Sequence, residues 1–330
     1  MIHPSDIGAR RFAHQAMNTE FEILCVHEDA DYAQQAAWAS FDLLDRIENE
    51  LSRFIPNSDI SRINHLAEGD SVRVSQWTVE CLELARQAYD ETGGAFDIAL
   101  GTGLERLRIS PRERLVGLGA GNPVRPLHGL EDIDTSVDAT DRSVDAAGTS
   151  VDATGTSVDA TGTSVDAADT GVDATGTSAC ATSNIRLDLG GIGKGYAIDR
   201  MAEVLDEWDI RQALIHGGHS SVLALDAPPG LDGWPLTLGE RSVVACRRAF
   251  SASGIRTQGD HIVDPRTGRP VGSRVAAWVS LELDGSPSPS AVAEAYSTAF
   301  MILPASEVDA ICARHPGLEA WLLEATRIGN

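Results

Sequence analysis

The spacing of apolar residues along the first hundred positions predicts two helices. Residues 31–52 carry apolar side chains at three- and four-residue intervals, which place them on one helical face: Ala37, Phe41, Leu44, Ile47 and Leu51. The stretch SQWTVECLELARQAYDETGG predicts a second helix, with Ser75 as its N-cap and Gly93 and Gly94 as its stop. In the connection between them, Ser58 or Asp59 is placed to cap a short third helix.

Short apolar runs further along the chain predict strands, namely FEILCV, QALIHG, SVLALD, SVVACRRAF and AAWVSLEL. One more helix is expected to start at Gly195, and another to run through AVAEAYSTAFMIL, residues 291–303. Helices and strands alternate irregularly, and the tight spacing of βαβ units is absent. We therefore expect an α+β fold in preference to a doubly wound parallel sheet.

Residues 134–180 interrupt this pattern with an aspartate-containing repeat of seven residues, as in SVDATGT. Each repeat offers one valine and little else apolar, so a coiled coil would bury too little to offset chain entropy. Calcium-binding β-roll repeats have about nine residues, which also excludes that class. The sequence therefore predicts a disordered acidic insertion between two parts of one domain, residues 1–133 and 181–330.

The composition is that of a globular protein, with 42% hydrophobic residues and a mean hydropathy of −0.11. The net charge of −23 argues against nucleic acid or an anionic membrane as a general partner, although the repeat contributes nine aspartates to it. The five cysteines are scattered without a C-x-x-C pair, which is typical of free thiols in a reducing compartment. With no signal-peptide pattern and no long apolar run, we expect a cytoplasmic protein without a membrane span.

Four glycines and a lysine separate an apolar run from a predicted helix in LDLGGIGKGYAID, residues 187–199, which we call the glycine loop. The spacing is G-x-G-x-G, and Lys194 is followed by Gly195, so neither the Rossmann nor the Walker A pattern is met. Flexible glycines before a helix N-terminus, together with a lysine, favour an anion site. The alternative is a tight turn with a surface lysine.

Two further groups of residues carry possible chemistry. Glu294 and Thr298 are four residues apart, so they share a helix face. With a loop carbonyl they would form an oxygen set that suits Mg²⁺, although an ordinary solvated helix face explains them as well. His261 precedes the turn sequence DPRTG, residues 264–268, and Ser253 lies eight residues before His261.

Six blocks occur in one order along the chain: AMNTEFEI, LSRFIPNSDISRIN, TGGAFDIALG, LDLGGIGKGYAID, SASG…HIVDPRTGRP and AEAYSTAF. Together they resemble the ApbE family of FAD:protein FMN transferases over about residues 11–325, apart from the insertion. The resemblance implies a T-fold-like α+β architecture with mixed or antiparallel sheets and packed helices. It also implies an Mg²⁺-dependent enzyme that moves FMN from FAD to a Ser or Thr hydroxyl of a target protein and releases AMP. The alternatives are hydrolysis of FAD to FMN and AMP, or binding of a flavin nucleotide without catalysis.

The resemblance also implies roles for individual residues. Glu294, Thr298 and the main-chain carbonyl of Gly193 would hold the metal, and His261 would be the catalytic base for the acceptor hydroxyl. Lys194 would act on the pyrophosphate beside the loop glycines. The remaining nucleotide contacts that it implies are Met17, Thr19, Phe54, Gly190, Gly191, Asp199 and Ser253.

The chain departs from the family pattern at several of these positions. Glu294 stands where the family has aspartate, and the longer side chain puts the rate in question because Mg²⁺ demands near-octahedral geometry. Gly193 replaces an alanine and Asn18 a glycine. His219 replaces an aspartate in LIHGGHSS, and its role is left open.

Overall fold

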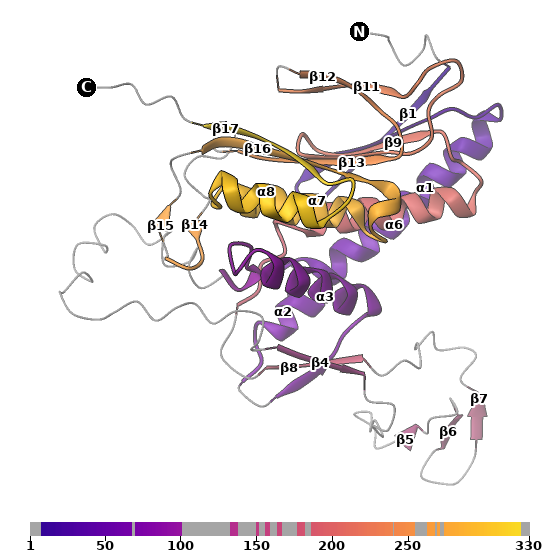
Figure 1. The fold of residues 1–330 in the computed structure, drawn as a ribbon. Helices are drawn as coiled ribbons and strands as arrows, with labels where there is room; N and C mark the ends of the chain where they lie inside the picture. The colour runs from indigo at the N-terminus through magenta and orange to yellow at the C-terminus, as the bar shows by residue number, and fades with distance from the viewer. Residues whose placement is uncertain are drawn as a thin grey trace, which may run out of the picture.

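The computed structural model describes residues 8–67, 70–100, 133–137, 150–151, 156–158, 164–166, 177–181, 186–239, 241–254, 263–267, 269–270 and 274–324. At its centre is a seven-stranded antiparallel sheet of order β1-β2-β9-β10-β13-β16-β17 (Figure 1). Its strands are β1 (Arg10–Ala16), β2 (Thr19–Cys25), β9 (Ala213–Gly217), β10 (Ser221–Ala224), β13 (Arg248–Gly254), β16 (Arg274–Glu282) and β17 (Glu319–Glu324). The α+β class expected from the sequence is confirmed, with antiparallel pairing throughout this sheet.

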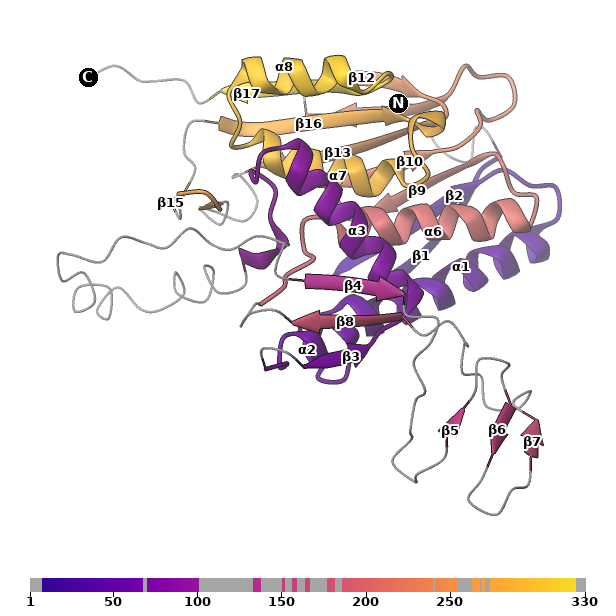
Figure 2. The same ribbon diagram turned by 60° about the horizontal axis from the view of Figure 1, so that its bottom comes forward.

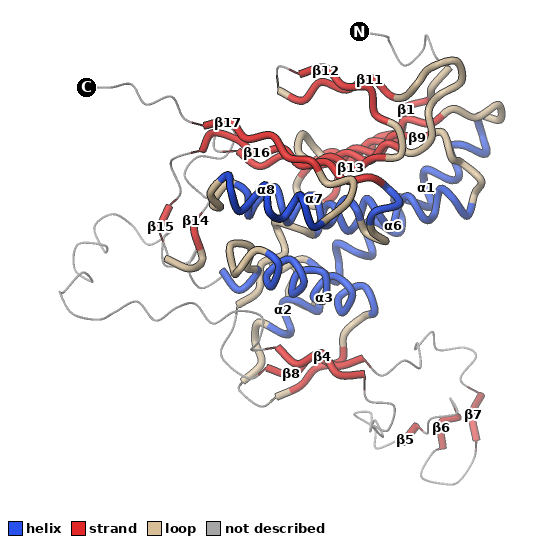
Figure 3. Tube along the Cα trace, in the orientation of Figure 1, coloured by secondary structure: helices blue, strands red, loops and turns tan. Residues whose placement is uncertain are grey.

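Helices form a layer on one face of the sheet (Figure 3). They are α1 (Ala30–Leu51), α6 (Gly193–Glu207), α7 (Pro289–Phe300) and α8 (Ala305–Arg314). Beyond them lie α2 (Asp59–Ile63) and α3 (Gln76–Glu91), and then a small sheet of order β3-β8-β4. The main hydrophobic core fills the space between the large sheet and these helices.

The predicted helices form where the apolar periodicity placed them. The predicted apolar face of α1 is buried, from Ala37 to Leu51. Ser75 caps α3 by accepting a hydrogen bond from the Thr78 backbone N–H at 3.2 Å, and Ser58 caps α2 in the same way. Gly93 and Gly94 follow α3 with φ of 57° and 76°, the left-handed conformation that ends a helix.

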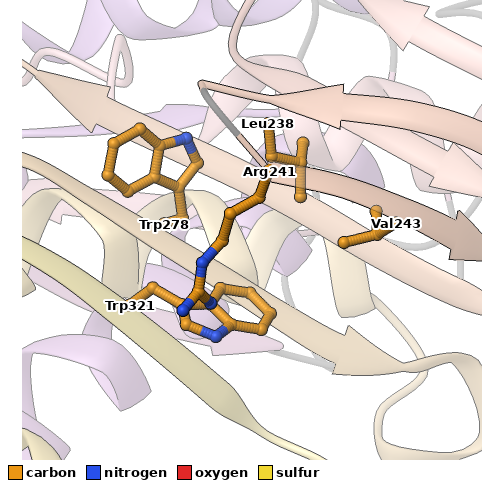
Figure 4. A pocket seen from close by; sticks show the side chains of 5 residues that line it. All are labelled: Leu238, Arg241, Val243, Trp278 and Trp321. Carbon is orange, nitrogen blue, oxygen red and sulfur yellow. The ribbon is translucent and has the colours of Figure 1, made fainter.

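The hairpin of β11 (Trp234–Leu238) and β12 (Arg241–Ala245) lies on the other face of the large sheet, over a second, smaller core. Figure 4 shows the Arg241 side chain running to Trp321, with its guanidinium carbon 5.7 Å from the indole centroid. The cavity beside them has about 20 Å³, which is room for one water molecule. It is far too small for a dinucleotide.

The single strand predicted for SVVACRRAF is wrong, because this stretch forms the end of β12 and the start of β13. Cys246 and Arg247 turn the chain between them, and Arg247 has a φ of 47°. A residue in this conformation breaks the extended backbone, so β12 stays in the hairpin while β13 joins the large sheet.

Much of the predicted insertion lies outside the described residues. At its ends, β4 (Ile133–Val137) and β8 (Thr177–Ala181) pair with each other, and β8 also pairs with β3 (Ser71–Arg73) (Figure 2). Short strands also occur at β5 (Ser150–Val151), β6 (Thr156–Val158) and β7 (Ser164–Asp166). Regular structure was not expected at these places, because the repeat buries few apolar side chains. Strand pairing nevertheless satisfies the backbone N–H and C=O groups there. For the rest of the segment, disorder stays a prediction.

The remaining elements are short. They are the 3₁₀ helices η2 (Ile98–Leu100) and η5 (Leu283–Gly285) and the strand pair β14 (Val263–Asp264) and β15 (Arg269–Pro270). None of the described helices combines the length and the hydropathy needed to span a membrane.

Candidate functional site

The glycine loop and α7 meet where α6 begins. Lys194 forms an ion pair with one carboxylate oxygen of Glu294, and the Gly195 backbone N–H donates to the other oxygen at 2.7 Å. Glu294 is only 4% exposed, so these two partners satisfy a buried charge. Residues a hundred positions apart in the sequence are thereby brought into direct contact.

Close backbone packing fixes this meeting point. A Cβ placed on Gly195 would lie 2.3 Å from the Ser290 carbonyl oxygen, which is closer than real Cβ contacts come. Only a glycine therefore allows α6 and α7 to approach so closely at this point. The predicted loop glycine has a structural use in addition to any role in binding an anion.

Thr298 and Ser253 lie beside the same loop. The Thr298 Oγ1 atom is 3.2 Å from Ser253 Oγ. A Cβ placed on Gly191 would lie 3.5 Å from Thr298 Oγ1. The Thr298 hydroxyl also donates to the Glu294 main-chain oxygen at 3.2 Å. Four of the predicted site residues are thus neighbours in the folded chain.

A cluster of hydroxyl groups behind Ser253 was not anticipated. The Ser297 Oγ atom lies 2.9 Å from Ser253 Oγ and 3.3 Å from Ser251 Oγ, and Ser251 and Ser297 are buried. Ser221 pairs with Ser251 in the sheet, and its buried hydroxyl has no hydrogen-bond partner among the described residues. Ser221 and Ser251 lie in strands and Ser297 lies in α7, and single serines in apolar elements give no sequence pattern that would have revealed this cluster.

Asp199 has a different environment from the one that a nucleotide contact suggests. Its buried carboxylate accepts hydrogen bonds from the backbone N–H groups of Ser290 at 3.0 Å and Ala291 at 2.9 Å, in the first turn of α7. Burial raises the pKa of Asp199 to about 7, although these two hydrogen bonds act in the opposite direction. Asp199 therefore caps α7 and holds the helix that carries Glu294.

Met17 and Thr19 lie at the turn between β1 and β2, where Met17 and Asn18 both have positive φ. A Cβ on Gly218, in the turn after β9, would lie 2.4 Å from Thr19 Oγ1. The strand registers place this turn at the same end of the sheet as Ser253. In this part of the structure His219 is exposed.

Phe54 is 74% exposed, and the Arg53 guanidinium lies 4.3 Å from its ring centroid. The Arg53 Nε atom is also 3.0 Å from Asp188 Oδ2, and Asp188 Oδ1 accepts from the Gly190 backbone N–H at 2.9 Å. The predicted ring is thus linked to the glycine loop through Arg53 and Asp188, two residues to which the sequence analysis gave no role.

His261, the predicted catalytic base, lies outside the described residues. The turn that follows it is described, and in it Asp264 Oδ1 accepts from the Arg266 backbone N–H at 3.0 Å. The Asp264 main-chain oxygen accepts from Thr267 N–H at 3.2 Å, so the turn predicted from DPRTG is confirmed over these residues.

Comparison with known proteins now identifies the family. The model of the ApbE family matches residues 17–322. The chain belongs to the ApbE family. No curated protein sequence matches it.

Solved structures of ApbE proteins share the fold at low sequence identity. Apo flavinyl transferase ApbE of Pseudomonas stutzeri has a TM-score of 0.68 and 18% identity, over 96% of this chain and 95% of that one. Flavin transferase ApbE of Vibrio cholerae has a TM-score of 0.67 and 18% identity, over 97% and 95%. The ApbE protein of Thermotoga maritima has a TM-score of 0.67 and 18% identity, over 96% and 94%.

The metal set implied by the ApbE resemblance can be tested against the contacts of Glu294. Among the described residues, no three His, Cys, Asp or Glu side chains come together to hold an ion. A carboxylate offers about four lone-pair positions, and Lys194 and Gly195 each take one on Glu294. Carboxylate, Thr298 hydroxyl and main-chain carbonyl are hard-oxygen ligands, so the donor chemistry fits Mg²⁺, with Lys194 as a competing cation.

Proposed function

We propose that this chain is a flavin transferase that moves the FMN part of FAD onto a Ser or Thr hydroxyl of a target protein and releases AMP, with Mg²⁺ at the site. The observation that carries the proposal is the meeting of Lys194, the glycine loop and Glu294 at the start of α6. Membership of the ApbE family and the fold shared with flavin transferases support it.

In this proposal the glycine loop receives the pyrophosphate of FAD. The N-terminus of α6 carries the positive end of the helix dipole, which favours an anion, and its Gly195 N–H already donates to the Glu294 carboxylate. Lys194 adds a full positive charge that is 22% exposed and can therefore reach a ligand. Transfer of a phosphoryl group asks the protein mainly to position the groups and neutralise their charge.

Glu294, Thr298 and the Gly193 carbonyl are the residues that would hold Mg²⁺. The ion would stabilise the charge that develops on the pyrophosphate oxygens. Lys194 neutralises the buried Glu294 carboxylate in the structure described here, and its ammonium would turn to the phosphates when the site is loaded. Asp199 keeps α7 in place by holding its first turn.

We assign the acceptor proton to His261, because a neutral imidazole can take a proton from a hydroxyl group as a general base. The hydroxyl oxygen would bond to the phosphorus on the FMN side. The bond from that phosphorus to the bridging oxygen would break, and AMP would leave with this oxygen. FAD and the acceptor protein are the partners in this reaction, and a cytoplasmic location belongs to the same proposal.

The test is AMP release by the purified chain with FAD and Mg²⁺, with and without a threonine-containing acceptor domain. We expect AMP release only with Mg²⁺ and the acceptor, and its loss in the Glu294→Ala and His261→Ala variants. AMP release without the acceptor would identify hydrolysis of FAD instead. Intact bound FAD with every acceptor and metal would show a binding protein and refute the transferase.

A further inference from the structure

Arg53 lies in the loop between α1 and α2, immediately before the exposed Phe54. Its guanidinium carbon is 4.3 Å from the centroid of the Phe54 ring, which places the cation over one face of the ring. The Arg53 side chain is only 15% exposed, whereas Phe54 is 74% exposed. A mostly buried arginine side chain therefore lies against an aromatic ring that is open to solvent.

Asp188 fixes the position of this arginine. Its Oδ2 atom is 3.0 Å from Arg53 Nε, and its Oδ1 atom accepts from the Gly190 backbone N–H at 2.9 Å. The Asp188 backbone N–H in turn donates to the Ile98 carbonyl at 2.8 Å, which anchors it in the core layer. Arg53, Asp188 and Gly190 thus form a direct connection from the Phe54 ring to the glycine loop.

The Arg53 guanidinium has hydrogen-bond donors that its contacts with Asp188 and Phe54 do not use. A guanidinium carries five N–H groups. In the part of the chain that the structure describes, Asp188 and the Phe54 ring are its partners, and its terminal nitrogens have no hydrogen bond. Because an arginine is always charged and presents its donors in a plane, it is well suited to two phosphate oxygens.

The ring has a free face as well. An exposed phenyl group with a cation on one side can stack an aromatic ring of a ligand on the other. One ligand that carries both an aromatic ring and phosphate groups would use the two features together, a few ångströms from the loop that is proposed to bind the pyrophosphate.

We propose that Arg53 is a further residue of the nucleotide site, where it donates hydrogen bonds to a phosphate oxygen of FAD and supports Phe54 against an aromatic ring of the same ligand. This inference rests on the proposed function, since it takes FAD as the ligand. The ion pair with Asp188 keeps the guanidinium in place before the ligand arrives.

The test is the affinity of the purified chain for FAD, measured by flavin fluorescence with Mg²⁺ and without an acceptor, at several salt concentrations. Loss of a charged hydrogen bond to phosphate predicts that Arg53→Met weakens FAD binding about 10- to 100-fold. It also predicts a shallower dependence of the affinity on salt, because one ionic contact is gone. Arg53→Lys keeps the charge and should recover part of the affinity.

Arg211→Met is the matched control, because Arg211 is 65% exposed and lies beyond the far end of α6. It removes the same charge and should leave FAD affinity and its salt dependence unchanged. Thermal denaturation of each variant, without ligand, reports whether the fold is intact.

Each result decides the inference. If the unaltered chain binds FAD and Arg53→Met binds it equally well, the inference fails while the proposed function stands. A weaker affinity with an unchanged salt dependence would also overturn it, because Arg53 would then act on the fold and not on phosphate. If the unaltered chain does not bind FAD, the proposed function is wrong, and the inference about Arg53 is then wrong as well.

Discussion

The closest backbone approach at the site gives a sharp prediction for Gly195→Ala. The added Cβ would lie 2.3 Å from the Ser290 carbonyl oxygen, 2.5 Å from the Ser290 carbonyl carbon and 2.7 Å from the Ala291 nitrogen. Cβ atoms essentially never come within 3.0 Å of such atoms. The two helices must therefore separate by at least about 0.7 Å, the difference between 3.0 Å and 2.3 Å.

That separation is costly because backbone atoms cannot rotate away as a side chain can. The same turn of α7 is held by Asp199 through two hydrogen bonds, and Gly195 itself donates to Glu294. Overpacking of this kind destabilises a protein by about 1–3 kcal/mol, and we expect the upper end of that range. The better helix propensity of alanine, worth about 1 kcal/mol, offsets only part of it.

Gly193→Ala is the matched control on the same helix. The nearest atom to its added Cβ is the Leu189 Cβ at 3.8 Å, an ordinary contact, so the variant should be neutral or slightly more stable. The net loss of about 2 kcal/mol should make Gly195→Ala melt roughly 4–8 °C below the unaltered chain, with Gly193→Ala at or above it. Equal melting temperatures for all three proteins would refute the tight contact between α6 and α7.

Two further predictions concern the carboxylates around α7. Glu294→Ala leaves the buried Gly195 N–H without a partner, at a cost of about 1–3 kcal/mol, whereas Glu294→Gln keeps an oxygen for it and should cost less stability. Both variants should abolish AMP release. Equal melting temperatures for the two variants would contradict the hydrogen bond between Gly195 and Glu294. Because burial raises the pKa of Asp199 from an ordinary value near 3.8 to about 7, the folded state binds more protons than the unfolded state between these values. Stability should therefore fall as pH rises from about 4 to about 7, by up to a few kcal/mol. Asp199→Asn cannot ionise and should remove this fall, whereas parallel curves of melting temperature against pH would contradict a raised pKa.

Local patterns made much of the fold predictable. The apolar faces of α1 and α3 and their capping residues follow rules that act within a few residues, and Ser75 and Gly94 lie where those rules place them. The split of one predicted strand into β12 and β13 was not predictable in this way. It depends on the positive φ of Arg247, and arginine is not a residue type from which a turn is predicted.

The candidate site also contains some residues that short sequence patterns predict and others that only the fold reveals. The residues of the glycine loop and of α7 stand out in the sequence because glycines, a lysine and a spaced carboxylate form short patterns. Arg53 and Ser297 act through contacts with residues that are distant in the sequence. Asp188 is 135 positions from Arg53, and Ser253 is 44 positions from Ser297. Asp199 was predicted as a nucleotide contact from the family resemblance, and only the fold reveals that its carboxylate caps α7.

The most direct test of the proposed activity is the mass of an acceptor domain after incubation with this chain, FAD and Mg²⁺. The proposal predicts that the acceptor gains the mass of one FMN less one water, because the phosphoester forms at a Ser or Thr hydroxyl. It further predicts that chelation of the metal or the Glu294→Ala substitution prevents the gain. An acceptor of unchanged mass, recovered beside intact FAD in every acceptor tested, would contradict the account.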